Sequence, residues 1–593
     1  MDMHEFYSGN SFDAYQYLGC HITASGAVFR TFAPAAQKIA VTGDFNQWSE
    51  TFMNKVHDGN FWECEISAAK PGMKYKYRIY GQDGYFVDHC DPYGFGMELR
   101  PHSSSVIRDL TDYRFCDDEW MASRDDRKDK PLNIYEIHAG SWKTDPTKEN
   151  GWFNYSELAD RIIPYVKELG YNYIELLPIC EHPCDNSWGY QNTGFYSPTS
   201  RYGTMNELKQ FIDKCHQNQI GVILDFVPVH FAIDDYALSN YDSTPLFEYP
   251  NADLGVSEWG SKNFNHSRGE VRSFLQSNAS YWLKEFHFDG LRMDAVSNLI
   301  YWQGNIKKGV NHNAVDFLKS MNSGLKSLYP QCMLIAEDST AFPNVTESVE
   351  NGGLGFDYKW DMGWMNDTLS YMSGNTLHRK KNPDKLSFSM MYYYDEKFLL
   401  PFSHDEVVHG KMTILQKMNG KYENKFPQAR ALYMYMYAHP GKKLNFMGNE
   451  FGQIREWDEK REQDWDILEY PNHDSFQKFM KDLNHLYLEH PGLWALDYEK
   501  NGFQWLNCNQ KKCIYCFLRT DGTQKMIAIF NFSRKSVLYR LKMKNTEALG
   551  LLAASDHEKY GGNVSYGTNK IYHDTSGTFL IRMGAFSAKY LLV

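Results

Sequence analysis

The sequence of 593 residues contains no long apolar run and no excess of positive charge. No apolar stretch approaches the roughly 20 residues that a membrane-spanning helix needs. The formal net charge is -12 at pH 7, so the chain has no basic excess with which to bind nucleic-acid phosphates. We therefore expect neither a membrane nor a nucleic acid as a partner.

The sequence also shows no secretory signal and no disulfide framework. Residues 1–10 contain no basic segment followed by an apolar one, which is the pattern of an export signal. The eleven cysteines are an odd number and are scattered between Cys20 and Cys516 without a repeated spacing, which favours reduced thiols. Both observations predict a cytoplasmic protein.

The chain consists of three stretches that differ in their pattern of apolar residues. Residues from about 20 to 110 hold short alternating strands separated by turns, and such strands return near the C-terminus, as at residues 526–530. Between them, apolar runs of strand length alternate with helix-length segments, which is typical of a parallel sheet. We therefore predict a multidomain protein with an N-terminal β-sandwich at 1–117, a central (β/α)8 TIM barrel at 118–498 and a C-terminal β-sandwich domain at 499–593.

Eight apolar runs of strand length predict the closed barrel. They lie at residues 133–138, 173–179, 221–228, 288–295, 332–338, 355–361, 398–405 and 443–450. Plausible helices with an apolar stripe lie between them, at residues 155–169, 205–217, 268–286 and 426–437. Eight strands with helical crossovers are the composition of a TIM barrel.

Charged side chains gather at the carboxyl ends of four of these predicted strands. Asp225 and His230 lie at or just beyond the end of the third run, Arg292 and Asp294 at the end of the fourth, Glu337 at the end of the fifth, and His404 and Asp405 at the end of the seventh. A parallel barrel places its active site at that end. Any one acidic residue more often caps a helix or pairs with an arginine, but four such strand ends together favour a converging catalytic site.

The residue types at these strand ends fit acid and nucleophile chemistry. Strand periodicity places Arg292 and Asp294 on the same face. An arginine beside an aspartate favours the ionised carboxylate that a nucleophile needs, whereas a carboxyl in a drier pocket near other anions can serve as an acid. Asp294 and Glu337 could divide these roles. His230 and His404, which as lone histidines would more often be packing residues, are expected to hydrogen bond to a substrate.

The four strand-end segments resemble the signature regions of the α-amylase superfamily of glycoside hydrolases and transglycosylases. Further segments are similar to the glycogen branching enzymes in particular, at residues 135–142, 188–191, 199–203, 363–368 and 403–411. The turn at residues 43–48 is similar to the carbohydrate-binding module that precedes the barrel in branching and debranching enzymes. The resemblance covers nearly the whole chain.

The resemblance implies a role for each predicted site residue. Asp294 would be the nucleophile, Glu337 the general acid/base and Asp405 the stabiliser of the transition state, in a retaining double displacement on an α-1,4 glucan. The donor subsite would be lined by Tyr190, Asp225, His230, Arg292 and His404.

The acceptor of the second step decides the product. Transfer to a glucan 6-hydroxyl makes an α-1,6 branch, whereas transfer to water would make the chain an α-glucan hydrolase of the debranching or trehalose-forming kind. A catalytically silent glucan-binding protein is a third alternative, which the presence of all three carboxylates disfavours. The branching-type segments lead us to expect a monomeric branching enzyme of glycogen biosynthesis, with glycogen or amylose as its partner.

Neither a metal nor a cofactor is expected. Calcium-dependent amylases carry an Asn ligand just before the histidine of the first signature, and the aliphatic side chain of Val229 stands there in this chain. Cys180, His182 and Cys184 lack the paired spacing of zinc sites. In the N-terminal module, Trp48 could either contact glucan or pack at its turn, and the sequence favours neither.

Overall fold

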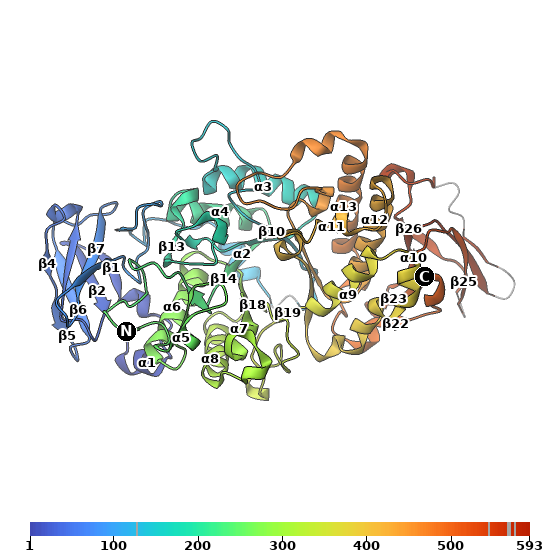
Figure 1. Cartoon of the computed structure of the whole chain (residues 1–593). Helices are drawn as coiled ribbons and strands as arrows, with labels where there is room; N and C mark the ends of the chain where they lie inside the picture. Colours follow the sequence, from blue (N-terminus) through green and yellow to red (C-terminus); the bar gives the residue numbers. More distant parts are fainter. Residues whose placement is uncertain (126–127, 544–545, 566–570, 574–576) are drawn as a thin grey trace. The chain divides into compact units, whose positions relative to one another are not determined.

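A computed structural model of the chain describes residues 1–125, 128–543, 546–565, 571–573 and 577–593 (Figure 1). The chain forms two compact units. The first comprises residues 1–126, 138–163 and 175–357, and the second comprises residues 127–137, 164–174 and 358–593. In the part of the chain that the structure describes, no helix is long and apolar enough to cross a membrane. All eleven cysteines are free thiols.

The first unit begins with the predicted β-sandwich. The short helix α1 (Met3–Ser8) precedes two antiparallel sheets, one with the order β1-β2-β6-β5 and the other β4-β3-β7-β8, with β9 paired to β7. Their strands are β1 (Gly19–Thr23), β2 (Gly26–Phe32), β3 (Lys38–Gly43), β4 (Thr51–Phe52), β5 (Asn54–Val56), β6 (Phe61–Ile66), β7 (Lys74–Tyr80), β8 (Phe86–His89) and β9 (Ser105–Val106). In β7, buried and more exposed residues alternate, as expected for a strand with one face in the core.

Eight parallel strands close into a barrel in the order β10-β11-β14-β17-β18-β19-β20-β21, which confirms the predicted fold class. They are β10 (Asn133–Ile137), β11 (Tyr173–Leu176), β14 (Gly221–Phe226), β17 (Gly290–Met293), β18 (Met333–Ala336), β19 (Tyr358–Trp360), β20 (Phe398–Phe402) and β21 (Lys442–Phe446). Every residue in them is buried, because strands of a parallel barrel are covered on both faces. Each predicted run overlaps one of these strands.

In the first unit, helices and short strands surround β14, β17 and β18. The helices are α2 (Asp118–Ser123), α4 (Met205–Gln217), α5 (Ala252–Gly255), α6 (Gly269–Glu285), α7 (Val296–Ile300) and α8 (His312–Leu328). Two small antiparallel pairs are β12 (Cys180–Glu181) with β13 (Gly194–Pro198), and β15 (His230–Phe231) with β16 (Lys262–Asn263). Helix α4 begins where predicted because Thr204 and Glu207 form a capping box at its N-terminus.

In the second unit, helices follow β19, β20 and β21. They are α9 (Met362–Ser373), α10 (Thr376–Lys381), α11 (Ile414–Lys417), α12 (Tyr422–Ala438) and α13 (Pro471–Glu489). Helix α12 begins four residues before the predicted start. The remaining barrel helix, α3 (Tyr155–Leu169), has the predicted bounds.

The second unit ends with two antiparallel sheets, as the return of short alternating strands predicts. One has the order β22-β23-β24-β29-β26, and the other β25-β28-β27. The strands are β22 (Phe503–Trp505), β23 (Ile514–Thr520), β24 (Lys525–Asn531), β25 (Val537–Lys542), β26 (Gly550–Ala554), β27 (Tyr572–His573), β28 (Thr578–Met583) and β29 (Ser587–Leu592). Side chains from both sheets, among them Ile527, Tyr539 and Ile581, share one hydrophobic core.

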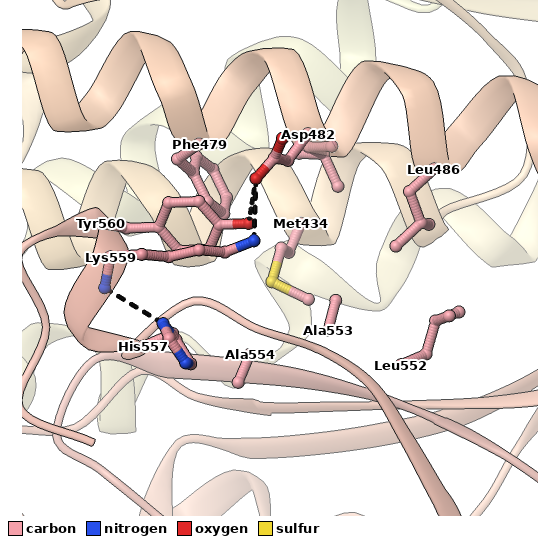
Figure 2. A pocket seen from close by; sticks show the side chains of 11 residues that line it. Met434, Phe479, Asp482, Leu486, Leu552, Ala553, Ala554, His557, Lys559 and Tyr560 are labelled. Carbon is pink, nitrogen blue, oxygen red and sulfur yellow. Dashed lines mark hydrogen bonds and ion pairs between the residues drawn. The ribbon is translucent and has the colours of Figure 1, made fainter. Parts of the chain in front are cut away.

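Residues of helix α13 and strand β26 line a small cavity of about 120 Å³ (Figure 2). Its apolar walls include Met434 and Phe479. At its rim, Asp482 of α13 accepts a hydrogen bond from the Tyr560 hydroxyl at 2.8 Å and pairs with the Lys559 ammonium at 2.9 Å. These contacts attach the C-terminal strands to the helical shell of the same unit.

A buried ion cluster lies at the amino end of β17. His216 of α4 contacts Asp117 through Nδ1 at 2.7 Å and Asp289 through Nε2 at 3.0 Å. Burial opposes the charged imidazole, but Asp289 and Asp117 outweigh it and raise the pKa of His216 to about 9. Because this end of a barrel strand serves stability rather than chemistry, we assign the cluster to the scaffold.

We predict that His216→Gln destabilises the protein in a pH-dependent way. A folded pKa of about 9 against an ordinary value of 6.5 corresponds to about 3 kcal/mol. Because the folded pKa is raised, this contribution is complete below pH 6.5 and is lost as the pH rises through 9. Denaturant unfolding at pH 6 and pH 9 should therefore show a larger deficit at pH 6. The exposed His312→Gln is the control, and a deficit independent of pH would contradict the assignment.

Candidate active site

The side chain of Arg292 lies at the centre of a cluster of three carboxylates. Its Nη1 donates to both carboxylate oxygens of Asp225 and to Oδ1 of Asp294, each at 2.8 Å, and its Nη2 lies 3.9 Å from Oε2 of Glu337. The parallel register of β14 and β17 places Asp225 opposite Arg292. The structure thus brings together four of the predicted site residues from three neighbouring strands.

Arg292 stays charged although its side chain is buried. Burial disfavours the cation, but the negative charges of Asp225, Asp294 and Glu337, together with Tyr190, raise the pKa of Arg292 well above its ordinary value. A buried charge of this kind is tolerated only when it is paired and hydrogen bonded. The guanidinium therefore acts as a fixed positive charge under the carboxylates.

Two of the three carboxylates reach the solvent. The side chains of Asp294 and Glu337 are 16% and 15% exposed, whereas those of Arg292 and Asp225 are each 1% exposed. Glu337 also accepts the backbone N–H of Ala295 at 2.7 Å, and Ala295 has a left-handed backbone with φ of 46°. Such strain in a non-glycine residue is common at functional sites. Asp294 and Glu337 can therefore meet a ligand, while Asp225 and Arg292 support them.

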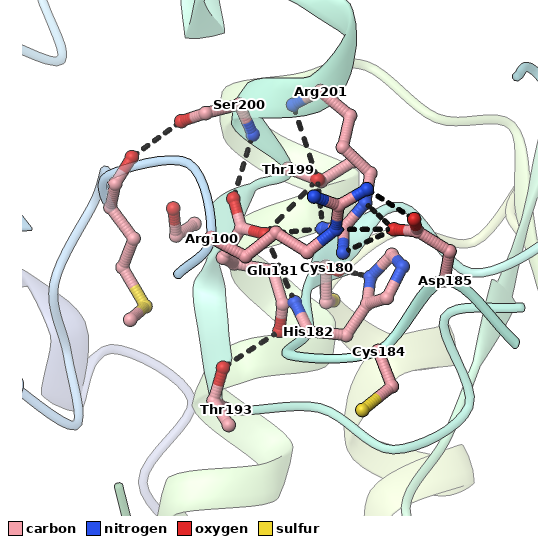
Figure 3. A network of polar contacts seen from close by, with 12 residues as sticks. Arg100, Cys180, Glu181, His182, Cys184, Asp185, Thr193, Thr199, Ser200 and Arg201 are labelled. Carbon is pink, nitrogen blue, oxygen red and sulfur yellow. Dashed lines mark hydrogen bonds and ion pairs between the residues drawn. The ribbon is translucent and has the colours of Figure 1, made fainter. Parts of the chain in front are cut away.

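Tyr190 joins this cluster from a loop with a buried ion network (Figure 3). Its hydroxyl donates to Oδ2 of Asp225 at 2.5 Å. Earlier in the same loop, Asp185 accepts hydrogen bonds from both Arg201 and Arg100. Arg201, whose side chain is 1% exposed, also pairs with Glu181 at 2.7 Å. The network fixes the loop that carries Tyr190.

The loop residues that could suggest zinc have other contacts. Nδ1 of His182 lies 2.8 Å from the carbonyl oxygen of Cys180, and burial lowers the pKa of His182 to about 3. In the described ranges, no group of three or more His, Cys, Asp or Glu side chains is arranged to hold a metal ion. The acidic side chains of this loop instead pair with arginines (Figure 3).

His230 lies in β15, and its described ring contact is with Trp259. The ring centroids are 5.0 Å apart, and Trp259 is 46% exposed. Burial lowers the pKa of His230 to about 4, so the imidazole is neutral at pH 7. A neutral ring can offer either nitrogen to a sugar hydroxyl.

In the second unit, His404 and Asp405 follow β20. Nδ1 of His404 lies 2.5 Å from Oε1 of Glu136, whose other oxygen accepts the His404 backbone N–H at 2.9 Å. Nε2 of His404 lies 3.5 Å from Oδ1 of Asp405, and the side chain of Asp405 is 41% exposed. Glu136, in β10, orients the imidazole toward Asp405. We did not predict this role. The signal that could have indicated it is the position of Glu136, a fully buried carboxylate within a barrel strand.

The closed barrel and the carboxylates at its strand ends are typical of glycoside-processing enzymes. Comparison with protein families supports this class. Residues 17–94 match carbohydrate-binding module 48, the isoamylase N-terminal domain. Residues 117–249 and 254–535 match the alpha amylase catalytic domain, which covers more than half of the chain. The protein is therefore a member of the α-amylase family.

Curated relatives narrow the family further. The 1,4-alpha-glucan branching enzyme GlgB of Fusobacterium nucleatum is 45% identical over 574 residues, which cover 95% of this chain and 93% of the relative. The enzyme of the same name from Oceanobacillus iheyensis is 43% identical and covers 95% and 92%. At this identity and coverage, the chain belongs to the family of 1,4-α-glucan branching enzymes.

Solved structures of lower identity share the fold. The catalytic module of the glycogen-degrading pneumococcal virulence factor SpuA has a TM-score of 0.76 at 17% identity, covering 99% of this chain and 98% of that one. The pullulanase from Anoxybacillus sp. LM18-11 has a TM-score of 0.75 at 16% identity, covering 100% and 89%. At such identities the likeness concerns the fold alone.

We predict that Arg292→Met destabilises the protein by about 3–5 kcal/mol, because it removes the cation from a buried ion cluster and leaves the carboxylates uncompensated. Denaturant unfolding at pH 7 would measure the loss. Arg268→Met is the matched control: Arg268 pairs with Glu270 and is 33% exposed, so we expect a loss below about 1 kcal/mol. Equal losses in the two variants would show that Arg292 does not support the cluster.

Proposed function

We propose that this protein acts as a 1,4-α-glucan branching enzyme of glycogen biosynthesis. It would cleave an α-1,4 glucan and transfer the released oligoglucan to a 6-hydroxyl, which forms an α-1,6 branch. The observation that carries the proposal is the Arg292 cluster, in which a buried cation supports the two partly exposed carboxylates of Asp294 and Glu337. Retaining glycoside chemistry needs a nucleophile and an acid of this kind.

In the first step, we assign Asp294 as the nucleophile and Glu337 as the acid. The hydrogen bond from Arg292 at 2.8 Å stabilises the ionised form of Asp294, whereas the guanidinium lies 3.9 Å from Glu337 and favours its ionised form less. Asp294 attacks the anomeric carbon, the bond to the glycosidic oxygen breaks, and Glu337 protonates that oxygen. The product is a covalent glycosyl-enzyme.

In the second step, the 6-hydroxyl of a glucan chain attacks the anomeric carbon of the glycosyl-enzyme. Glu337, now ionised, accepts the hydroxyl proton, the α-1,6 bond forms, and Asp294 leaves as a carboxylate. Both enzyme groups return to their starting protonation states. Two inversions at one carbon retain the α configuration.

The other predicted residues are proposed to bind the donor chain. Asp405 would stabilise the oxocarbenium-like transition state and hydrogen bond to sugar hydroxyls. The donor subsite would be formed by Tyr190, Asp225, His230, Arg292 and His404, with the buried Asp225 and Arg292 acting through the groups above them.

The remaining expectations are proposed together with this activity. They are the division at residues 1–117, 118–498 and 499–593, glycogen or amylose as the substrate, and a monomeric, cytoplasmic enzyme without a cofactor. For Trp48, the exposed fraction of 41% favours glucan contact over packing, and its indole N–H donates to Asp44 at 3.1 Å, which orients the ring.

We predict that the protein, incubated with amylose, creates isoamylase-sensitive branches without a matching rise in reducing ends. Asp294→Asn should lower branch formation by at least about 1,000-fold, because it removes the nucleophile. Asp316→Asn, an exposed position in α8, is the control and should retain full activity. Net hydrolysis by the wild type would instead indicate an α-glucan hydrolase, and binding without turnover would indicate a glucan-binding protein.

A further inference from the structure

The loop that follows Asp405 has an unusual backbone. His409, Gly410 and Met412 have φ of 57°, 79° and 68°, all in the left-handed region. Glycine adopts this region freely, but other residues do so uncommonly. Two non-glycine residues of this kind within four positions require contacts that hold the loop in shape. We refer to residues 408–413 as the 408–413 loop.

Two charged side chains from outside the loop hold its backbone. Oε2 of Glu456 accepts the N–H of Gly410 at 2.9 Å, and its Oε1 accepts the N–H of Met412 at 2.6 Å. The Gly410 hydrogen bond contributes most to lowering the pKa of Glu456. Lys417 donates to the carbonyl of Met412 at 2.7 Å. One carboxylate therefore accepts from both strained segments of the loop.

The loop folds back onto the residue that we assign to transition-state stabilisation. The ammonium of Lys411 donates to the backbone carbonyl of Asp405 at 2.8 Å and to Oε1 of Glu406 at 3.2 Å. The side chains nevertheless face the solvent, since Met412 is 46% exposed and His409 is also exposed. The 408–413 loop, which contacts Asp405 through Lys411, thus presents an apolar side chain and an imidazole to the solvent.

A transferase of this type needs a surface for its second substrate. The glycosyl-enzyme reacts with whatever hydroxyl reaches it, so branching requires that a glucan chain binds near the reaction centre more effectively than water does. Apolar and imidazole groups suit the faces and hydroxyls of sugars. A rigid loop also loses little conformational freedom when it binds a chain.

We propose that the 408–413 loop binds the acceptor glucan and that Glu456 is the positioning residue that holds it. This inference rests on the proposed branching function and extends it to the choice between glucan and water. Glu456 acts through the loop backbone and does not itself contact the reacting atoms.

The variant Glu456→Gln tests this role. Each oxygen of Glu456 accepts one backbone N–H, and a glutamine would place its own NH2 group against one of them, so one contact must be lost. On amylose, we expect the number of branches per reducing end released to fall by at least about fivefold. The total number of bonds cleaved should change less than about twofold. Glu469→Gln, which changes an exposed carboxylate at the end of the 3-10 segment before α13, should match the wild type.

The concentration of amylose separates acceptor binding from a general structural defect. If Glu456→Gln weakens acceptor binding, a higher amylose concentration restores the wild-type ratio of branches to reducing ends, whereas a damaged catalytic centre is not restored. Should Glu456→Gln fail to fold, Met412→Gly supplies the same test, because glycine accepts a φ of 68° while the exposed side chain is removed.

The experiment distinguishes a failure of the acceptor role of the loop from a failure of the branching function. A wild-type ratio in Glu456→Gln, or in Met412→Gly where the first variant does not fold, overturns the role of the loop and leaves the branching function standing. A lowered ratio that amylose does not restore also overturns it. A wild-type protein that forms no branches overturns the branching function, and the acceptor role falls with it.

Discussion

The buried guanidinium of Arg292 is the charge on which the carboxylate cluster of the first unit depends. It holds Asp225 and Asp294 at hydrogen-bonding distance and has Glu337 within 4 Å. Carboxylates this close and this poorly solvated would repel one another strongly without a cation. Because Arg292 lies on β17 and Asp225 lies opposite it on β14, the parallel register itself creates the cluster. The chemistry of the site is thus a consequence of strand pairing.

Buried ion pairs also hold the scaffold around this chemistry. In the first unit, His216 joins Asp117 to Asp289. In the second, Asp497 lies fully buried between Lys442 of β21 and Arg519 of β23, at 3.1 and 2.7 Å. Each pair connects segments distant in sequence, and removing one partner would leave an uncompensated charge in the interior. Such contacts permit few alternative arrangements, which suits an enzyme that must keep its carboxylates in place.

The sequence predicted the barrel, and it singled out the four residues that form the Arg292 cluster, because the signals are local. Buried parallel strands are continuous apolar runs, and a charged residue at the end of such a run, as at Asp294, points to the catalytic face. Pairings between distant residues leave no such signal. Glu136 meets His404 across 268 positions, and nothing in the β10 run reveals its partner. For His230, the contact with Trp259 could not be foreseen either, because Trp259 lies shortly before β16, the strand that pairs with β15.

The proposed roles of the carboxylates would explain which bond breaks but not which bond forms. Asp294 and Glu337 would support attack by water and by a sugar hydroxyl equally well. The preference for a glucan acceptor must therefore come from groups that bind the acceptor. A modest difference in the free energy of acceptor binding is sufficient, because about 1.4 kcal/mol changes the ratio of transfer to glucan over transfer to water tenfold. A loop held rigid by Glu456 and Lys417 can supply it, since little conformational entropy is lost on binding. The strain in the 408–413 loop is then understandable as the cost of a preformed acceptor surface next to Asp405.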